Sequence, residues 1–213
     1  MIDFLGNNIL IIGAHADDIE IGCGGTAGKL LSLGAQVVGL VITDTHYVRD
    51  GVVHRDAETS KKEAIEAAGV IGYDVYFGNV RNNDVKVNSE LVYFIRNYIE
   101  KFKVRTIFTH WDGDAHLDHR NVALATMMAT RDPRNLIMYR TNHYISPSAF
   151  SPNFLIDISD NFEKKMEAIS CYRAELERGG NSYFDWIRHA NKASGATANV
   201  EYAEEFWIVK CYK

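Results

Sequence analysis

Short apolar runs alternate along this chain with stretches in which apolar residues recur at helical spacing. Continuous apolar runs predict buried strands, and a period near 3.6 predicts helices. The predicted strands comprise residues 9–12, 37–43, 75–77, 106–109, 154–158 and 206–212, and the predicted helices comprise residues 26–33, 59–68, 91–102, 119–130 and 161–172. Strands and helices that alternate in this way, with largely apolar strands, indicate an α/β fold. We therefore expect a doubly wound, mostly parallel sheet with helices on both faces.

Two predicted connections, residues 43–56 and 179–199, are longer than the rest. Long connections in compact domains commonly act as substrate loops or lids, so we expect both of them near a site. The chain has 213 residues and contains no internal repeat, low-complexity tract or linker. A single domain spanning residues 1–213 is therefore expected.

Two clusters of histidine and aspartate each follow a predicted strand. Residues 14–18 read Ala-His-Ala-Asp-Asp and follow the strand at 9–12, and residues 114–119 read Asp-Ala-His-Leu-Asp-His and follow the strand at 106–109. The carboxyl ends of parallel strands meet at one edge of the sheet, where α/β proteins place their sites. The two clusters together predict a metal site at that edge.

His15, Asp18 and His119 are the candidate metal ligands. A catalytic zinc ion takes three protein ligands and keeps one position for water. Asp17 and His116 would then lie in the pocket without being ligands. A carboxylate can take a proton from water activated by a metal, and an imidazole can stabilise an oxyanion and protonate a leaving group. These residue types are the ones that hydrolysis requires.

Each cluster taken alone has an ordinary structural explanation. An aspartate pair after a strand commonly caps a helix, and a glycine-rich stretch such as residues 22–25 commonly serves tight packing. The coincidence of both clusters favours the metal site. Asp118 lies two residues from His116 and is expected to orient one of its ring nitrogens. His110, at a strand end, is a candidate supporting residue.

Composition narrows the class of protein. The formal net charge is −5 and no basic stripe is present, which disfavours a nucleic-acid partner. The N-terminal residues lack the pattern of a signal peptide, and no apolar stretch approaches the ~20 residues of a membrane span. Cys23, Cys171 and Cys211 form no recognisable disulfide or zinc pattern, so a cytoplasmic location is expected. Cys23 is expected to be a buried packing residue rather than a soft metal ligand.

The two clusters resemble the motifs of the LmbE-like (PIG-L) family of zinc-dependent N-deacetylases. The first family motif is Ala-His-Pro-Asp-Asp followed by a glycine-rich stretch, and the second is His-Pro-Asp-His with an aspartate two positions before its first histidine. Residues 14–26 and 114–119 match these patterns, except that Ala16 and Leu117 replace the motif prolines. Loss of proline loosens a turn without removing a chemical group, so activity is expected to survive.

The resemblance implies a Rossmann-like fold and zinc bound by the three ligands named above, and Fe²⁺ in place of zinc is also compatible. It implies Asp17 as the general base and His116 as the electrophilic or acid residue, tuned by Asp118. It further implies hydrolysis of an N-acetyl group on an amino-sugar-containing small molecule or glycoconjugate, giving acetate and a free amine. The sequence does not identify the substrate or the oligomeric state, and a homo-oligomer is compatible with it.

Substrate-binding residues are less well marked. The family often places a substrate-binding arginine three residues before a helix glutamate, but counting back from Glu63 gives Ser60. Arg49 and Arg55 are the candidate replacements. Trp186 is a candidate pocket wall, because sugar rings stack on aromatic faces.

Two other functions stay open at this point. Two histidines and one aspartate also form the facial triad of a non-haem iron oxygenase. The glycine-rich residues 22–25, at a helix start, are also compatible with a nucleotide-binding module without catalysis. A carboxylate next to a metal ligand favours hydrolysis over the first alternative, and Asp17 and Asp18 would repel the phosphate that the second requires.

Overall fold

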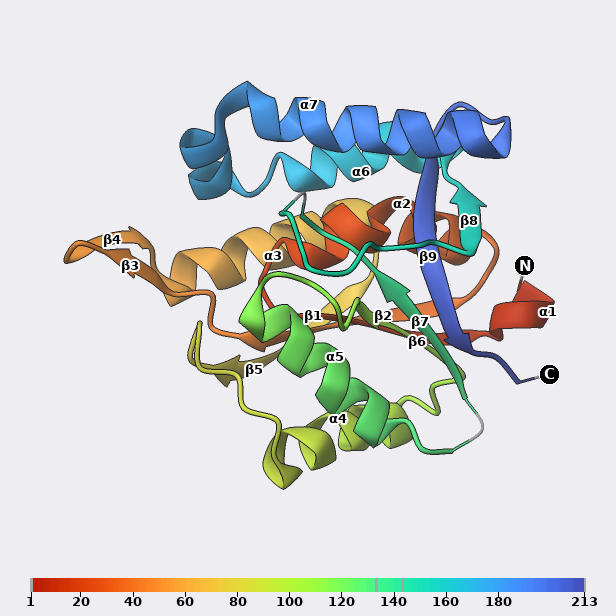
Figure 1. Ribbon diagram of the computed structural model, residues 1–213, viewed down its shortest axis with the longest axis horizontal. Helices are drawn as coiled ribbons and strands as arrows, with labels where there is room; N and C mark the ends of the chain where they lie inside the picture. Colours follow the sequence, from red (N-terminus) through yellow and green to blue (C-terminus); the bar gives the residue numbers. More distant parts are fainter. Residues whose placement is uncertain (1, 133, 143, 213) are drawn as a thin grey trace.

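The computed structural model describes residues 2–132, 134–142 and 144–212. Its centre is a seven-stranded sheet in the order β5-β2-β1-β6-β7-β9-β8 (Figure 1). The strands are β1 (Asn8–Gly13), β2 (Gln36–Thr43), β5 (Asp74–Val80), β6 (Thr106–His110), β7 (Asn135–Tyr139), β8 (Phe154–Asp157) and β9 (Ala203–Lys210). Strands β5, β2, β1, β6 and β7 are parallel, and β9 runs antiparallel to both of its neighbours. The expected mostly parallel α/β sheet is confirmed.

Helices cover both faces of this sheet (Figure 1). They are α1 (Ile2–Leu5), α2 (Asp18–Ser32), α3 (Ala57–Ile71), α4 (Ser89–Lys101), α5 (Leu117–Ala129), α6 (Phe162–Ile169) and α7 (Arg173–Ala198), with a 3-10 turn at Ser159–Asn161. On β1, Ile9 and Ile11 join the core that contains α2, α3, α6 and α7, whereas Leu10 and Ile12 join the core that contains α4 and α5. Because both faces of β1 are buried, residues 9–12 of the strand are all apolar.

Helix α2 begins at Asp18, eight residues before the predicted start at residue 26. The glycine-rich stretch therefore lies inside the helix, where it permits close packing on the sheet. A Cβ at Gly22 would collide with the Tyr139 ring, and a Cβ at Gly25 would lie 2.7 Å from Ile158. Cys23 is fully buried in the same core, as expected.

The connection at residues 43–56 contains a two-stranded hairpin, formed by β3 (Tyr47–Arg49) and β4 (Val52–Arg55), which projects from the main body (Figure 1). The segment 179–199 was expected to be a long connection, but it belongs to helix α7 as far as Ala198, with an interruption at Gly180 and with Asn199 as the C-cap. The prediction failed because the buried face of α7 carries polar residues. Asn191 and Ser194 lie on it and make hydrogen bonds to Ala203 and Glu205 of β9.

Strand β7 was not predicted, although all of its residues are buried. It lies between β6 and β9 and so joins the N-terminal and C-terminal parts of the chain in one sheet. Among the helices that the structure describes, none combines the length and apolar character needed to cross a membrane.

Candidate metal centre

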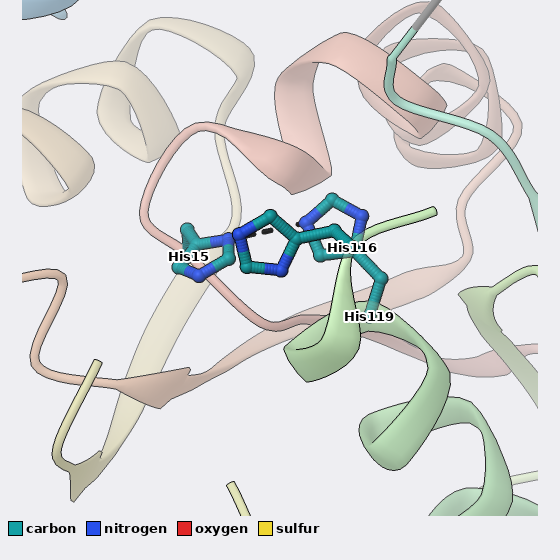
Figure 2. A group of neighbouring side chains, drawn as sticks. All are labelled: His15, His116 and His119. Carbon is teal, nitrogen blue, oxygen red and sulfur yellow. Dashed lines mark hydrogen bonds between the residues drawn. The ribbon is translucent and has the colours of Figure 1, made fainter. Parts of the chain in front are cut away.

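The two histidine–aspartate clusters meet at one edge of the sheet. His15 lies in the turn between β1 and α2, and Asp18 begins α2. His119 lies in the first turn of α5, which follows β6. Strands β1 and β6 are adjacent and parallel, so the segments that leave their carboxyl ends come together. Figure 2 shows the imidazole rings of His15, His116 and His119 grouped at this point.

The three predicted ligands present their donor atoms to a common centre. His15 Nδ1 lies 3.1 Å from His119 Nε2 and 3.3 Å from Asp18 Oδ2. His119 Nε2 lies 3.4 Å from Asp18 Oδ1. Donor atoms around a tetrahedral zinc ion with bonds of 2.0–2.1 Å are separated by about 3.3 Å. The donor set, two imidazoles and one carboxylate, therefore fits a single divalent cation.

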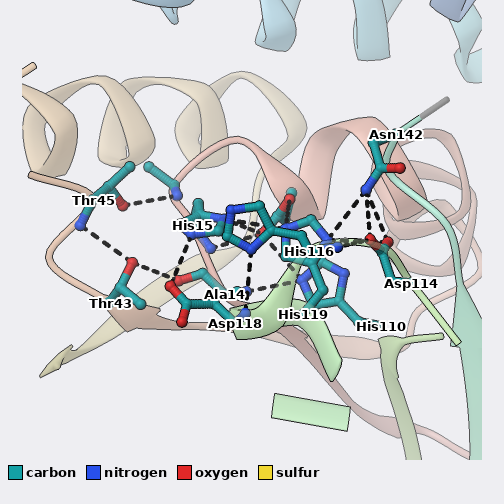
Figure 3. A network of polar contacts seen from close by, with 12 residues as sticks. Ala14, His15, Thr43, Thr45, His110, Asp114, His116, Asp118, His119 and Asn142 are labelled. Carbon is teal, nitrogen blue, oxygen red and sulfur yellow. Dashed lines mark hydrogen bonds and ion pairs between the residues drawn. The ribbon is translucent and has the colours of Figure 1, made fainter. Parts of the chain in front are cut away.

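Carboxylates contact the remaining ring nitrogens of both candidate histidine ligands (Figure 3). Asp114 Oδ2 lies 3.1 Å from His119 Nδ1, and Asn142 donates its amide N–H groups to both carboxylate oxygens of Asp114. Asp118 Oδ2 lies 3.4 Å from His15 Nε2. Such partners fix the tautomer and orientation of a histidine ligand. With a metal bound, His119 would coordinate it through Nε2 and His15 would coordinate it through Nδ1, after His15 lost the proton on that nitrogen.

The contacts of Asp118 differ from the expectation that its carboxylate orients His116. That carboxylate accepts the backbone N–H groups of Asn83 at 2.7 Å and Val85 at 3.3 Å, and it faces His15. Asp118 touches His116 only through its backbone N–H, which donates to His116 Nδ1 at 3.2 Å. The reason is that His116 is the N-cap of α5, so its ring folds back onto the start of that helix.

His116 lines the pocket next to the candidate ligands. Its ring centroid lies 4.8 Å from that of His15 and 4.6 Å from that of His119. Burial, with added repulsion from these two imidazoles, lowers the pKa of His116 to about 4. Because Nδ1 accepts a hydrogen bond, the proton of the neutral ring resides on Nε2. His116 is thus a neutral hydrogen-bond donor at pH 7.

Asp17 occupies the N-cap position of α2 without acting as a cap. Its backbone angles are helical, at φ −93° and ψ −11°, and its side chain makes no capping hydrogen bond. A capping aspartate has an extended backbone and accepts an N–H of the first helical turn. The side chain lines the pocket instead and is 9% exposed. Helix capping therefore does not explain this residue.

The electrostatics of the cluster favour positive charge at its centre. Burial alone would lower the pKa of His15, but contacts with Asp118 and Asp18 raise it to about 10. Burial would likewise raise the pKa of Asp18, but the imidazoles of His119 and His110 hold it well below the usual range. The buried carboxylates thus stabilise a cation between them, as a metal site requires.

His110 lies behind this cluster. Its ring stacks on His119 with centroids 3.9 Å apart, and its Nε2 lies 3.0 Å from Asp18 Oδ2. Asp18, His110 and His119 are one of two described groups whose donor atoms lie close enough together for a metal ion, and the other is His15, His116 and His119. However, His110 Nε2 also accepts the backbone N–H of Ala14 at 2.9 Å. Because this nitrogen already accepts a backbone hydrogen bond, His110 is a poorer candidate ligand than His15.

A cavity of about 300 Å³ opens onto these side chains. Its lining comprises His15, Asp17, Asp18, Thr45, Tyr47, Arg55, Asn82, Asn83, His116, His119, Thr141, Asn142, Tyr144, Glu175 and Tyr183. Of the three candidate substrate residues, only Arg55 lies in it. Arg49 is on the hairpin, where its side chain is 71% exposed beside Asp50. Trp186 lines a separate cavity of about 40 Å³.

Several lining residues were not predicted from the sequence. Thr141 and Asn142 follow the carboxyl end of β7, and Asn82 follows that of β5. The strand-end rule that identified the two clusters would also have found Asn82, and it would have found the β7 residues had that strand been predicted. Glu175 and Tyr183 belong to α7 and carried no such signal.

Comparison with known proteins identifies the family. A family model described as PIG-L, GlcNAc-PI de-N-acetylase, matches residues 10–130, and the chain belongs to this family. It is 31% identical over 139 residues to the uncharacterized deacetylase YaiS of Escherichia coli, covering 62% of this chain and 73% of that protein. It is 29% identical over 188 residues to the diacetylchitobiose deacetylase of Thermococcus kodakarensis, covering 79% of this chain and 70% of the relative.

Solved structures share the fold. The N,N'-diacetylchitobiose deacetylase from Pyrococcus horikoshii superposes with a TM-score of 0.83 at 22% identity, covering 95% of this chain and 84% of that one. The Rossmann-like fold is therefore confirmed. Family membership makes the protein an enzyme of the N-deacetylase class. An iron oxygenase and a nucleotide-binding module without catalysis are not favoured.

Proposed function

We propose that this enzyme is a divalent-metal-dependent hydrolase that removes the N-acetyl group from an amino sugar or a small conjugate of one, releasing acetate and a free amine. The observation that carries this proposal is the convergence of His15 Nδ1, His119 Nε2 and the two carboxylate oxygens of Asp18, at contacts of 3.1–3.4 Å, in the pocket that Asp17 also lines. The names of the relatives, which include diacetylchitobiose deacetylases, support this substrate class.

The proposed ligands are His15, Asp18 and His119, and the proposed ion is zinc. Two nitrogen donors and one oxygen donor with a free fourth position suit catalytic zinc, and Fe²⁺ accepts the same donors. When bound there, a divalent cation supplies Lewis-acid activation of water and of the amide carbonyl. In this scheme Asp114 and Asp118 hold the two imidazoles in orientation.

The remaining groups move protons and stabilise charge. Asp17 takes a proton from the water that attacks the acetyl carbon, and this water supplies the oxygen of the acetate. His116 donates its Nε2–H to the oxyanion that develops on the carbonyl oxygen. As the C–N bond breaks, the amine nitrogen takes up the proton that Asp17 received, so no other reactant is required.

Arg55 is the proposed substrate arginine, in place of the family arginine that Ser60 replaces. It lines the pocket, whereas Arg49 and Trp186 lie outside it and are not part of the proposal. A cytoplasmic location remains part of the proposal. It is supported by an odd number of cysteines at unrelated spacings.

The test is release of primary amine from N-acetylglucosamine and diacetylchitobiose by protein loaded with Zn²⁺ or Fe²⁺. Asp17→Asn is expected to lower kcat by about 10²-fold or more with metal content unchanged, because the base is lost and the ligands stay. His119→Ala is expected to lose bound metal, measured by mass spectrometry. Near-normal turnover by Asp17→Asn would disprove the base assignment, and no amine from any N-acetyl sugar would disprove the function.

A further inference from the structure

The pocket contains polar atoms, apart from the candidate ligands, that lack a hydrogen-bond partner in the described part of the chain. They are Nε and Nη1 of Arg55, Oγ1 of Thr141 and Oδ1 of Asn82. Arg55 is 6% exposed and Thr141 is 3% exposed. Leaving buried polar groups unpaired is costly, so such atoms in a pocket wall indicate where a ligand makes its hydrogen bonds.

These three residues approach the cavity from different elements. Arg55 ends β4, Asn82 follows β5 and Thr141 follows β7. The amide nitrogen of Asn82 donates to the carbonyl of His46 at 3.0 Å, which leaves its oxygen for a ligand. Arginine only donates, an amide oxygen only accepts, and a threonine hydroxyl does both. This mixture matches sugar hydroxyls, which donate and accept, and it does not match a phosphate at neutral pH, which mainly accepts.

The charge of the pocket also favours a neutral sugar over a phosphorylated one. Arg55 Nη2 forms a buried ion pair with Glu175, which is 8% exposed. Among the described lining residues, Arg55 is the single arginine or lysine, and Asp17, Asp18 and Glu175 contribute carboxylates. An anionic substituent would lose its hydration and meet an arginine whose charge is already offset. A neutral ring meets no such penalty.

We propose that the pocket selects a neutral amino-sugar ring, whose hydroxyls bind Arg55, Thr141 and Asn82, and that Glu175 excludes rings carrying phosphate. This inference rests on the proposed function and narrows its substrate class. The volume of about 300 Å³ is at the lower end of the range for small-molecule sites, which fits one ring with its acyl group.

The experiment compares kcat/KM for N-acetylglucosamine with that for its 6-phosphate and its 1-phosphate. The unaltered enzyme is expected to favour the neutral sugar about tenfold or more, the size expected for one unfavourable charged contact. Glu175→Gln removes the negative charge that offsets the Arg55 guanidinium, so it is expected to shift this preference toward the phosphates by about tenfold. Glu163→Gln changes the net charge equally on an exposed side chain of α6 and should leave the preference unchanged.

Equal or greater activity on both phosphates would overturn the proposal. An unchanged preference in folded Glu175→Gln would overturn the role of that residue. Thr141→Val provides a test that does not depend on the ion pair. It removes one hydroxyl at nearly constant shape and is expected to raise KM for the neutral sugar about tenfold with little change in kcat, while Thr141→Ser restores KM. An unaltered KM in Thr141→Val would contradict the hydroxyl contacts.

Calorimetry on the metal-free protein separates this inference from the proposed function. If no amine is released from any sugar, the deacetylase proposal fails. The binding affinities for N-acetylglucosamine and its phosphates still test whether the pocket prefers a neutral ring. Tighter binding of N-acetylglucosamine than of its phosphates, weakened by Thr141→Val, would support the pocket assignment. Tighter binding of the phosphates, or binding of neither sugar at millimolar concentration, would overturn it.

Discussion

Replacing Gly22 with alanine should destabilise the protein, because this glycine lets α2 pack directly on the sheet. An added Cβ would lie within 2.9 Å of three ring carbons of Tyr139. That ring is fully buried and its hydroxyl donates to the carbonyl of Ile12 at 2.6 Å, so it has little freedom to move aside. Either the helix or the ring must shift.

The magnitude follows from three contributions. Overpacking of a buried site costs about 1–3 kcal/mol, and distortion of the tyrosine hydrogen bond costs about 1 kcal/mol. Replacing glycine with alanine inside a helix offsets about 1 kcal/mol. The net expectation is a loss of about 1–3 kcal/mol in the free energy of unfolding, or roughly 2–12 °C in Tm for a chain of this size.

Gly69→Ala is the matched control. Gly69 lies in α3 on an exposed position, and a Cβ there would have no heavy atom within 4 Å. This variant should gain about 0.5–1 kcal/mol from helix propensity alone. Urea denaturation followed by circular dichroism measures both variants. If Gly22→Ala were as stable as the unaltered protein, or if both variants changed stability by the same amount, the packing explanation for the glycine-rich stretch would be wrong.

Three further predictions follow from buried charges. Lys165→Met should lower the free energy of unfolding, measured by urea denaturation, by about 3–5 kcal/mol, because it leaves the buried carboxylate of Glu204 without the ammonium that lies 2.7 Å away. Replacing both residues with methionine should recover most of this loss. Asp114→Asn should weaken metal binding about 10–100-fold in a chelator competition, because the carboxylate that contacts His119 Nδ1 becomes a neutral amide; unchanged affinity would contradict this. Burial raises the pKa of Glu20 from 4.5 to about 7. The folded state therefore holds a proton that the unfolded state has released, so stability should fall by about 3 kcal/mol as pH rises from 4.5 to 7, and Glu20→Gln should remove that slope from pH-dependent unfolding curves.

The parts of the fold and site that follow from local patterns were predictable from the sequence. Strand β1 is buried on both faces, so its apolar run was a clear signal, and the polar residues after β1 and β6 had to meet because adjacent parallel strands end at one edge. His15, Asp18 and His119 were predicted to converge in this way, and their donor atoms do lie together.

Features that depend on tertiary contacts were not predictable in the same way. The start of α2 was predicted eight residues too late, because the contact with Tyr139 that makes Gly22 a favourable helical residue comes from a strand more than a hundred residues away. The helical period of α7 was obscured because its buried face carries Asn191 and Ser194, whose partners are on β9. The carboxylate of Asp118 meets His15 rather than His116, because backbone N–H groups after β5 hold it there.

The ion pair between Arg55 and Glu175 joins the β3–β4 hairpin to α7, and neither of these elements carries a candidate metal ligand. The residues proposed to catalyse the reaction and the residues proposed to select the substrate thus lie on different elements of the fold. Exchanging the hairpin or the first turns of α7 would alter which molecule is admitted while leaving the cation-binding edge intact. Divergence within such a scaffold can proceed by changing these peripheral segments, and redesign of the enzyme for new amides should begin with them.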